Sequence, residues 1–218
     1  MHSANTKLLL LGLVGVVLGV VLGTALWLRL QPSQSARFPS TAEDGLQRYG
    51  AVPDFTLTER SGNPLSLKEL RGKIWIADFI YTNCTDTCPL QTAMLAKLQQ
   101  EYAAFRDLRL VSFSVDPERD SAPVLAHYAE KHGADADRWY FLTGPRDRLL
   151  DLIQKGFHLA VATAPLGTEP SGMIAHSPRF VLVDKQSQIR GYYDSREPEA
   201  LARLKNHIDV LLKDRRDG

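Results

Sequence analysis

The chain has 218 residues, with 26 lysines and arginines against 25 aspartates and glutamates, so its formal net charge is +1. This length accommodates one domain of ordinary size with accessory segments. The balanced charge, and the lack of a dense basic block, argue against nucleic acid as a partner. Both cysteines of the chain, Cys84 and Cys88, fall in one short stretch, which makes that stretch the first candidate for function.

The N-terminal segment differs in composition from the rest. Residues 8–28 (Leu8 to Leu28) are uncharged and almost wholly apolar, between Lys7 and Arg29. As a helix such a run is about 30 Å long, which matches the hydrocarbon core of a bilayer. We therefore predict a membrane anchor over residues 1–30 with one transmembrane helix. The small residues Gly23-Thr24-Ala25 leave a cleaved signal peptide as the alternative.

The flanking charges hardly favour either orientation of this helix, because cations stand on both sides of it. With only seven residues before the span, the long C-terminal part is expected on the non-cytoplasmic side. Residues 31–45 are polar and contain prolines and serines, which predicts a flexible tether. Residues 46–218 would then form the folded domain.

From Val52 on, short runs rich in β-forming residues alternate with helical patterns. The order is a strand, the cysteine turn, a helix, a strand, a helix, and then a β-hairpin followed by a closing helix. This order predicts an α/β fold of the thioredoxin-like type. The expected strands are 55–57, 74–81, 108–115, 139–142, 179–183 and 188–193, and the expected helices 66–70, 89–105, one around 124–128, 146–155 and 198–212.

The helix after the cysteines carries an apolar stripe at helical spacing. We expect this stripe to face the core rather than a cofactor; its members are Leu90, Met94, Leu98, Tyr102 and Phe105.

Cys84 and Cys88 are four residues apart, at the point where the buried strand gives way to the helix. At this spacing two side chains share one helix face, close enough for a disulfide or for a shared metal ion. The N-terminus of a helix favours the thiolate, whereas Asp86 between the cysteines would oppose it. The pair can therefore cycle between dithiol and disulfide or bind a soft metal.

Two thiolates are ligands for Cu(I) or Zn(II), but a structural zinc site needs four protein ligands and no second cysteine pair exists. Two cysteines and one histidine suit copper. His176 is the favoured third ligand, because the loop that it ends should pack beside the cysteine turn in a thioredoxin-like domain. The remaining histidines are His2, His127, His132, His158 and His207.

Two further interpretations of the cysteines remain. A purely stabilising disulfide is disfavoured, because bridging so short a loop removes little chain entropy. A peroxidase-like site is also disfavoured, because the local motif supplies no arginine to polarise a peroxide.

Four stretches resemble the Sco/SenC family of membrane-anchored, thioredoxin-like copper proteins, and the similarity covers about residues 52–212. The first is the CxxxCP stretch Phe79–Pro89, and the others are Ser114–Asp120 with its sequence SVDPERD, His176–Asp184, and Ile189–Asp194.

The resemblance implies that Cys84, Cys88 and His176 are copper ligands, for Cu(I) or Cu(II). It implies a metallochaperone rather than an enzyme, which serves the CuA site of cytochrome c oxidase. The expected partners are the copper-bearing oxidase subunit, other copper chaperones, and the membrane through residues 8–28. The expected location is the inner membrane, as a single-pass protein with a periplasmic domain. The alternative is a thiol-disulfide oxidoreductase in which Cys84 and Cys88 form a disulfide and keep target cysteines reduced.

Overall fold

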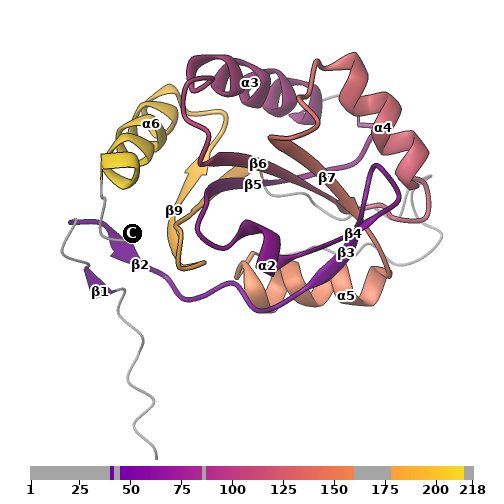
Figure 1. The fold of residues 1–218 in the computed structure, drawn as a ribbon, viewed down its shortest axis with the longest axis horizontal. Helices are drawn as coiled ribbons and strands as arrows, with labels where there is room; N and C mark the ends of the chain where they lie inside the picture. Colours follow the sequence, from indigo (N-terminus) through magenta and orange to yellow (C-terminus); the bar gives the residue numbers. More distant parts are fainter. Residues whose placement is uncertain (1–39, 42–44, 85–86, 160–177, 214–218) are drawn as a thin grey trace, which may run out of the picture. The chain divides into compact units, whose positions relative to one another are not determined.

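The computed structural model describes residues 40–41, 45–84, 87–159 and 178–213. They form a mixed seven-stranded sheet with helices on both faces, plus a two-stranded sheet (Figure 1). The strands are β1 (Ser40–Thr41), β2 (Gln47–Arg48), β3 (Thr56–Glu59), β4 (Pro64–Ser66), β5 (Ile74–Ile80), β6 (Leu108–Ser114), β7 (Trp139–Thr143), β8 (Arg179–Val183) and β9 (Ile189–Asp194). The helices are α2 (Leu67–Leu70), α3 (Thr87–Glu101), α4 (Ala122–Lys131), α5 (Arg146–Asp151), the π-helical turn η1 (Leu152–Gly156) and α6 (Pro198–Lys213).

The strand order in the larger sheet is β4-β3-β7-β6-β5-β8-β9. β5, β6 and β7 run parallel, and the pairs β5–β8, β8–β9, β3–β7 and β3–β4 are antiparallel. Helices α3 and α4 connect the three parallel strands. Because β5 and β6 are parallel neighbours, the loops that follow them leave the sheet at the same edge. One of these loops carries Cys84.

β5 is the central element of the core, and all seven of its residues are buried. A strand covered on both faces reads as a continuous apolar run, as this one does except at Asp78. Its even-numbered residues Ile74, Ile76 and Ile80 belong to one apolar cluster. Its odd-numbered residues Trp75, Ala77 and Phe79 belong to the other.

The two clusters lie on opposite faces of the sheet, and different helices cover them. Residues of α3, α4 and α6 pack in the first cluster, and residues of α2, α5 and η1 pack in the second. Figure 1 shows α3, α4 and α6 above the sheet and α2 and α5 below it. The cysteines belong to the first cluster, so that face is called the cysteine face here. The opposite face is called the aromatic face, because Trp75, Phe113 and Phe157 pack edge-on or tilted against one another there.

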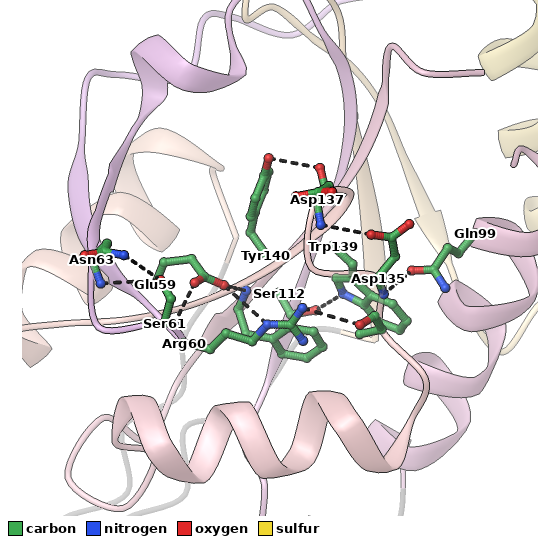
Figure 2. Close-up of polar contacts among 12 residues, drawn as sticks. Glu59, Arg60, Ser61, Asn63, Gln99, Ser112, Asp135, Asp137, Trp139 and Tyr140 are labelled. Atoms are coloured by element: carbon green, nitrogen blue, oxygen red, sulfur yellow. Dashed lines mark hydrogen bonds and ion pairs between the residues drawn. The ribbon is translucent and has the colours of Figure 1, made fainter. Parts of the chain in front are cut away.

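Polar contacts hold the chain where it enters β7 (Figure 2). The Asp135 amide donates to the Gln99 side chain at 2.9 Å, and the Asp137 amide donates to Asp135 at 2.9 Å. Within β7, the Trp139 indole N–H donates to Ser112 Oγ on β6 at 2.9 Å. This bond satisfies a buried donor on the cysteine face and ties the two strands together.

A buried ion pair joins β9 to the turn that follows β8. Arg190 Nη1 on β9 donates to Asp184 Oδ2 at 2.9 Å, and its other nitrogens donate to the carbonyls of Leu46 and Gln47. Asp184 also accepts the amides of Gln186 and Gln188 in the β8–β9 turn. The N-terminal end of the described domain is thereby joined to the hairpin.

The thioredoxin-like α/β fold is confirmed, and each predicted strand and helix has a counterpart close to its expected bounds. The prediction that the apolar stripe of α3 faces the core was wrong for two of its residues. Leu90 is 49% exposed and Phe105 is 44% exposed. Phe105 lies beyond the end of α3 at Glu101, so helical spacing does not determine its position. Leu90 is exposed because the helix turns Cys88, Gln91 and Thr92 toward the sheet instead.

The predicted anchor lies outside the described residues. In the described part of the chain, no helix has the length and apolar character needed to cross a bilayer. Ser40 and Thr41, within the stretch predicted as a tether, pair as β1 with Arg48 and Gln47 of β2. The short edge strands β1, β2 and β4 carry too few residues for the sequence pattern to indicate them.

Candidate metal centre

The chain leaves β5 at Ile80 and enters the cysteine turn, which comprises Tyr81, Thr82, Asn83 and Cys84. The Cys84 amide donates to the Tyr81 carbonyl at 3.2 Å, which closes the turn. The Val115 amide after β6 donates to the Ile80 carbonyl at 2.8 Å, so the sheet ladder continues to the base of the turn. The position of Cys84 is therefore set by the ends of β5 and β6.

Cys88 lies in the first turn of α3, which begins at Thr87 rather than at Pro89 as predicted. The Cys88 amide is one of the N–H groups that a helix leaves without an intrahelical partner. It donates to Cys84 Sγ at 3.4 Å. This bond places the two cysteines side by side and favours negative charge on the Cys84 sulfur.

Both cysteines are reduced thiols in the structure, and both are buried: Cys84 is 8% exposed and Cys88 is 0% exposed. Burial raises the pKa of Cys88 above its ordinary value, because a thiolate loses hydration there. A hydrogen bond with the Tyr81 backbone acts in the opposite direction, and the neighbouring Cys84 and Asp78 raise the pKa further. A bound cation would remove this penalty, since it replaces the proton and neutralises the thiolate.

A group of buried polar side chains lies on the same face behind the cysteines. Asp78 on β5 is 0% exposed, and neither of its carboxylate oxygens has a hydrogen-bond partner among the described residues. Burial raises the pKa of Asp78 to about 7. Ser112, its partner in the β5–β6 register, acts to lower this pKa without reaching hydrogen-bonding geometry. Gln91 on α3 is likewise buried without a partner for either side-chain atom in the described part of the chain.

Thr92 on α3 and Tyr128 on α4 form a second pair of buried polar side chains near Cys88. Thr92 Oγ1 donates to the Cys88 carbonyl at 2.8 Å and lies 2.8 Å from the Tyr128 hydroxyl. Burial, and then the charges of Asp78 and the cysteines, raise the pKa of Tyr128. The hydroxyl therefore stays protonated and can serve as a donor.

Sequence reasoning missed this polar group. It treated 74–81 as an apolar strand, and the signal that it passed over was one aspartate, Asp78, in the middle of that strand. It placed Tyr128 in the helix expected around 124–128 without a role at the site, and it gave no role to Gln91 or Thr92. Only the packing of α3 and α4 on the sheet shows that these side chains lie behind Cys88.

The predicted third ligand, His176, lies outside the described residues, so its place relative to the cysteines stays a prediction. The other histidines in the described part of the chain have different surroundings. His127 and His158 are exposed. His132 packs at a tilt against Tyr128 with ring centroids 4.5 Å apart, and His207 Nδ1 lies 2.6 Å from the Tyr193 hydroxyl. Within the described residues, no three side chains of histidine, cysteine, aspartate or glutamate gather as metal ligands.

The fold and the paired thiols define a thioredoxin-like domain with a buried CxxxC site at the carboxyl edge of its parallel strands. A family model described as SCO1/SenC matches residues 43–209. The chain therefore belongs to the SCO1/SenC family.

Relatives support this assignment. The chain is 35% identical to a SCO1 protein homolog of Bacillus subtilis over 148 residues, which are 67% of this chain and 75% of the relative. Its fold resembles that of BsSco, described as a member of the Sco family of cytochrome c oxidase assembly proteins with a disulfide switch. That likeness has a TM-score of 0.64 and 32% identity, and covers 76% of this chain and 96% of BsSco.

The fold also resembles two further structures. A SCO1/SenC family lipoprotein of Bacillus anthracis matches with a TM-score of 0.65 and 29% identity, over 74% of this chain and 95% of that one. Yeast Sco1 with copper bound matches with a TM-score of 0.60 and 24% identity, over 73% of this chain and 89% of that one. At 24% identity, the likeness to yeast Sco1 establishes the fold alone.

Proposed function

We propose that the protein is a copper-binding assembly factor that prepares the CuA site of cytochrome c oxidase. The observation that carries the proposal is the pair of buried, reduced thiols held side by side at the start of α3. Copper is the cargo, bound by the sulfurs of Cys84 and Cys88 and by the imidazole of His176. Two thiolates and one imidazole form a soft donor set that suits Cu(I), and an exchange of these ligands for thiolates of the oxidase subunit would deliver the metal.

The residues around the pair support this role. The Cys88 amide stabilises charge on Cys84, while burial keeps water away from both sulfurs. Cys88 must lose its proton before it can bind the metal, and its raised pKa makes copper binding compete with protons. We therefore expect copper affinity to rise with pH until Cys88 binds the metal without competition.

A copper titration tests the proposal. The full chain in detergent, reduced and titrated with Cu(I) in competition with a chelator, should bind one copper ion. Cys84→Ser and Cys88→Ser should abolish binding, and His176→Ala should raise the Kd by about 100-fold or more, because one of three ligands is lost. His127→Ala is the matched control, since His127 is exposed on α4, and it should leave the Kd unchanged. An unchanged Kd in His176→Ala would contradict the three-ligand site.

The same geometry favours a second function, thiol-disulfide exchange, because Cys84 and Cys88 are close enough to form a disulfide. In that case the pair would keep the cysteines of a target protein reduced. This function needs both cysteines but not His176. Two results together would establish exchange as the main activity. The wild-type protein would have no measurable copper affinity, and His176→Ala would reduce target disulfides at the wild-type rate.

We further propose that residues 8–28 cross the inner membrane once and that the domain lies on the periplasmic side. The uncharged apolar run supports the single span. A reporter that is active only in the cytoplasm, fused after Gly218, should give no signal. Strong cytoplasmic activity would reverse the orientation.

A further inference from the structure

The SVDPERD stretch that follows β6 has a feature that copper binding by itself does not explain. Its last residue, Asp120, is 1% exposed, and its carboxylate points at the cysteine turn. Oδ1 accepts the Thr82 hydroxyl at 2.6 Å and the Thr82 amide at 3.2 Å. Oδ2 accepts the Ser114 hydroxyl at 2.6 Å and lies 3.3 Å from the same Thr82 amide. One carboxylate thus bridges the end of β6 and the cysteine turn.

The loop that presents Asp120 is itself well held. The Asp120 amide donates to the Asp116 carbonyl at 2.9 Å, and the Asp116 amide donates to Ser114 Oγ at 3.1 Å. Arg119 Nη1 donates to the Asp116 carboxylate at 2.8 Å. The carboxylate of Asp120 is therefore carried by a constrained turn rather than by a freely moving side chain.

The group that Asp120 holds stands two residues before Cys84. Thr82 offers both its backbone amide and its hydroxyl, so the contact restrains the backbone as well as the side chain. Cys84 is then fixed by its own bond to the Tyr81 carbonyl. Cys88, in contrast, is carried by α3. The separation of the two sulfurs consequently depends on how firmly the turn is held relative to the helix.

We propose that Asp120 is a positioning residue for the cysteine pair: by holding Thr82 it sets the place of Cys84 Sγ relative to Cys88, and so controls both copper affinity and the dithiol–disulfide equilibrium. Asp120 touches neither sulfur. The copper part of this inference rests on the proposed function, whereas the effect on the disulfide equilibrium does not. A pre-set donor pair binds metal more tightly, because less ordering is left to do on binding.

The chain offers a matched control at the opposite end of the sheet. Asp184 is also a buried aspartate, 3% exposed, that holds a turn by accepting backbone amides. Because β8 is antiparallel to β5 and Val183 pairs with Trp75, Asp184 lies near the start of β5, whereas Cys84 follows its end. A seven-residue strand separates the two ends by about 20 Å. Loss of Asp184 should therefore weaken the fold without moving the cysteines.

The test measures three quantities on the reduced full chain in detergent: the Kd for Cu(I), the equilibrium constant of the cysteine pair in a glutathione buffer, and the melting temperature. In the glutathione reaction two glutathione thiols are oxidised to one glutathione disulfide, while the Cys84–Cys88 disulfide is reduced to two thiols. Asp120→Ala should raise the copper Kd by about 10-fold or more, as loss of outer supports of a metal site does. It should also shift the glutathione constant by more than threefold.

A finer pair of variants isolates the bridge from general damage. Thr82→Val keeps the size of the side chain but removes the hydroxyl, and should raise the copper Kd about fivefold, the effect of one lost hydrogen bond. Thr82→Ser keeps the hydroxyl and should stay within twofold of the wild type. Asp184→Asn should lower the melting temperature and leave the other two quantities within twofold. If Asp120→Ala does not fold, the comparison of Thr82→Val with Thr82→Ser decides the matter.

The outcomes separate the two proposals. The positioning role is overturned if the Thr82→Val and Asp120→Ala proteins melt at a lower temperature but keep the wild-type copper Kd and glutathione constant. If the wild type itself binds no copper, the proposed function fails, and the glutathione constant of the same variants still supports or overturns the positioning role.

Discussion

The two faces of the central sheet are built differently although they share the same strands. On the aromatic face, Phe79 stacks on Phe113 at 5.7 Å between centroids, and Phe157 packs against both. The cysteine face contains Asp78, whose carboxylate has no hydrogen-bond partner among the described residues. Both faces are almost completely shielded from water. They differ in what burial does to the side chains: it stabilises rings and penalises carboxylates.

This difference indicates a division of roles between the faces. The aromatic face contributes stability through large, tightly packed apolar side chains. The Trp75 indole nitrogen on this face has no hydrogen-bond partner among the described residues. On the cysteine face, Asp78 and Gln91 are buried without hydrogen-bond partners among the described residues, which costs stability. Both lie close to the residues that are proposed to bind copper. Unsatisfied buried groups of this kind tend to occur at functional sites.

The largest effect on stability is expected from the aromatic face. Phe113→Ala should lower the free energy of unfolding by about 3–5 kcal/mol, because it removes the ring that Phe55, Phe79 and Phe157 contact. Its copper Kd should change by less than threefold, since Phe113 faces away from the cysteines. Denaturant unfolding and copper titration of the same protein measure the two effects. A large loss of copper affinity would show that the faces are coupled.

The next effect is a dependence of stability on pH, which Asp78 on the cysteine face should cause. The pKa of Asp78 is raised to about 7 in the folded state from 3.8, so the folded protein binds the proton more tightly than the unfolded chain. Its contribution to stability is therefore lost as pH rises from about 4 to 7. Asp78→Asn should remove this loss and be more stable than the wild type at pH 8 by on the order of 4 kcal/mol. At pH 4 the two proteins should be nearly equal.

Denaturant unfolding at both pH values, without copper, checks this prediction. Asp147→Asn is the control, because Asp147 is exposed on α5 below the aromatic face. It should show the wild-type dependence of stability on pH. Equal pH dependence in Asp78→Asn and the wild type would mean that Asp78 keeps its charge when buried.

Copper should stabilise the folded protein through the cysteine pair. At a free copper concentration of 100 times the Kd, binding to the native state alone adds about 2.7 kcal/mol to the free energy of unfolding. Chelation should reverse the gain, and Cys88→Ala should show none. Without copper, opening or closing a Cys84–Cys88 disulfide should shift the melting temperature only slightly, because the bridged loop is short. Collapse of the fold on reduction would show that the bridge is structural.

The smallest effect is expected behind the cysteines. Thr92→Val should lower the free energy of unfolding by about 1–2 kcal/mol, because it leaves the buried Tyr128 hydroxyl without that partner. Thr92→Ser keeps the hydroxyl and should recover most of the loss. Unfolding curves of the two variants measure the difference. Equal stability would show that the bond between Thr92 and Tyr128 contributes nothing.

The sequence predicted the fold well because its strongest signals are local. A β-rich apolar run predicted β5, and apolar residues at helical spacing after the cysteines predicted the helix that follows. The predictions for α3 were less accurate at its edges. Leu90 has helical spacing to the core stripe yet is exposed, since the exact rotation of a helix depends on what it packs against.

The sequence by itself determined the α/β order of elements, the placement of both cysteines at a strand-to-helix junction, and the soft donor chemistry of the site. The tertiary structure alone decided which distant residues reach that junction. Thr92 and Tyr128 meet near Cys88, on the face to which Asp78 belongs, because α3 and α4 cover the same face of the sheet, and Asp120 reaches Thr82 because β5 and β6 are parallel neighbours. Local sequence patterns report the conformation of one segment, whereas the surroundings of a side chain depend on contacts between segments far apart in the chain.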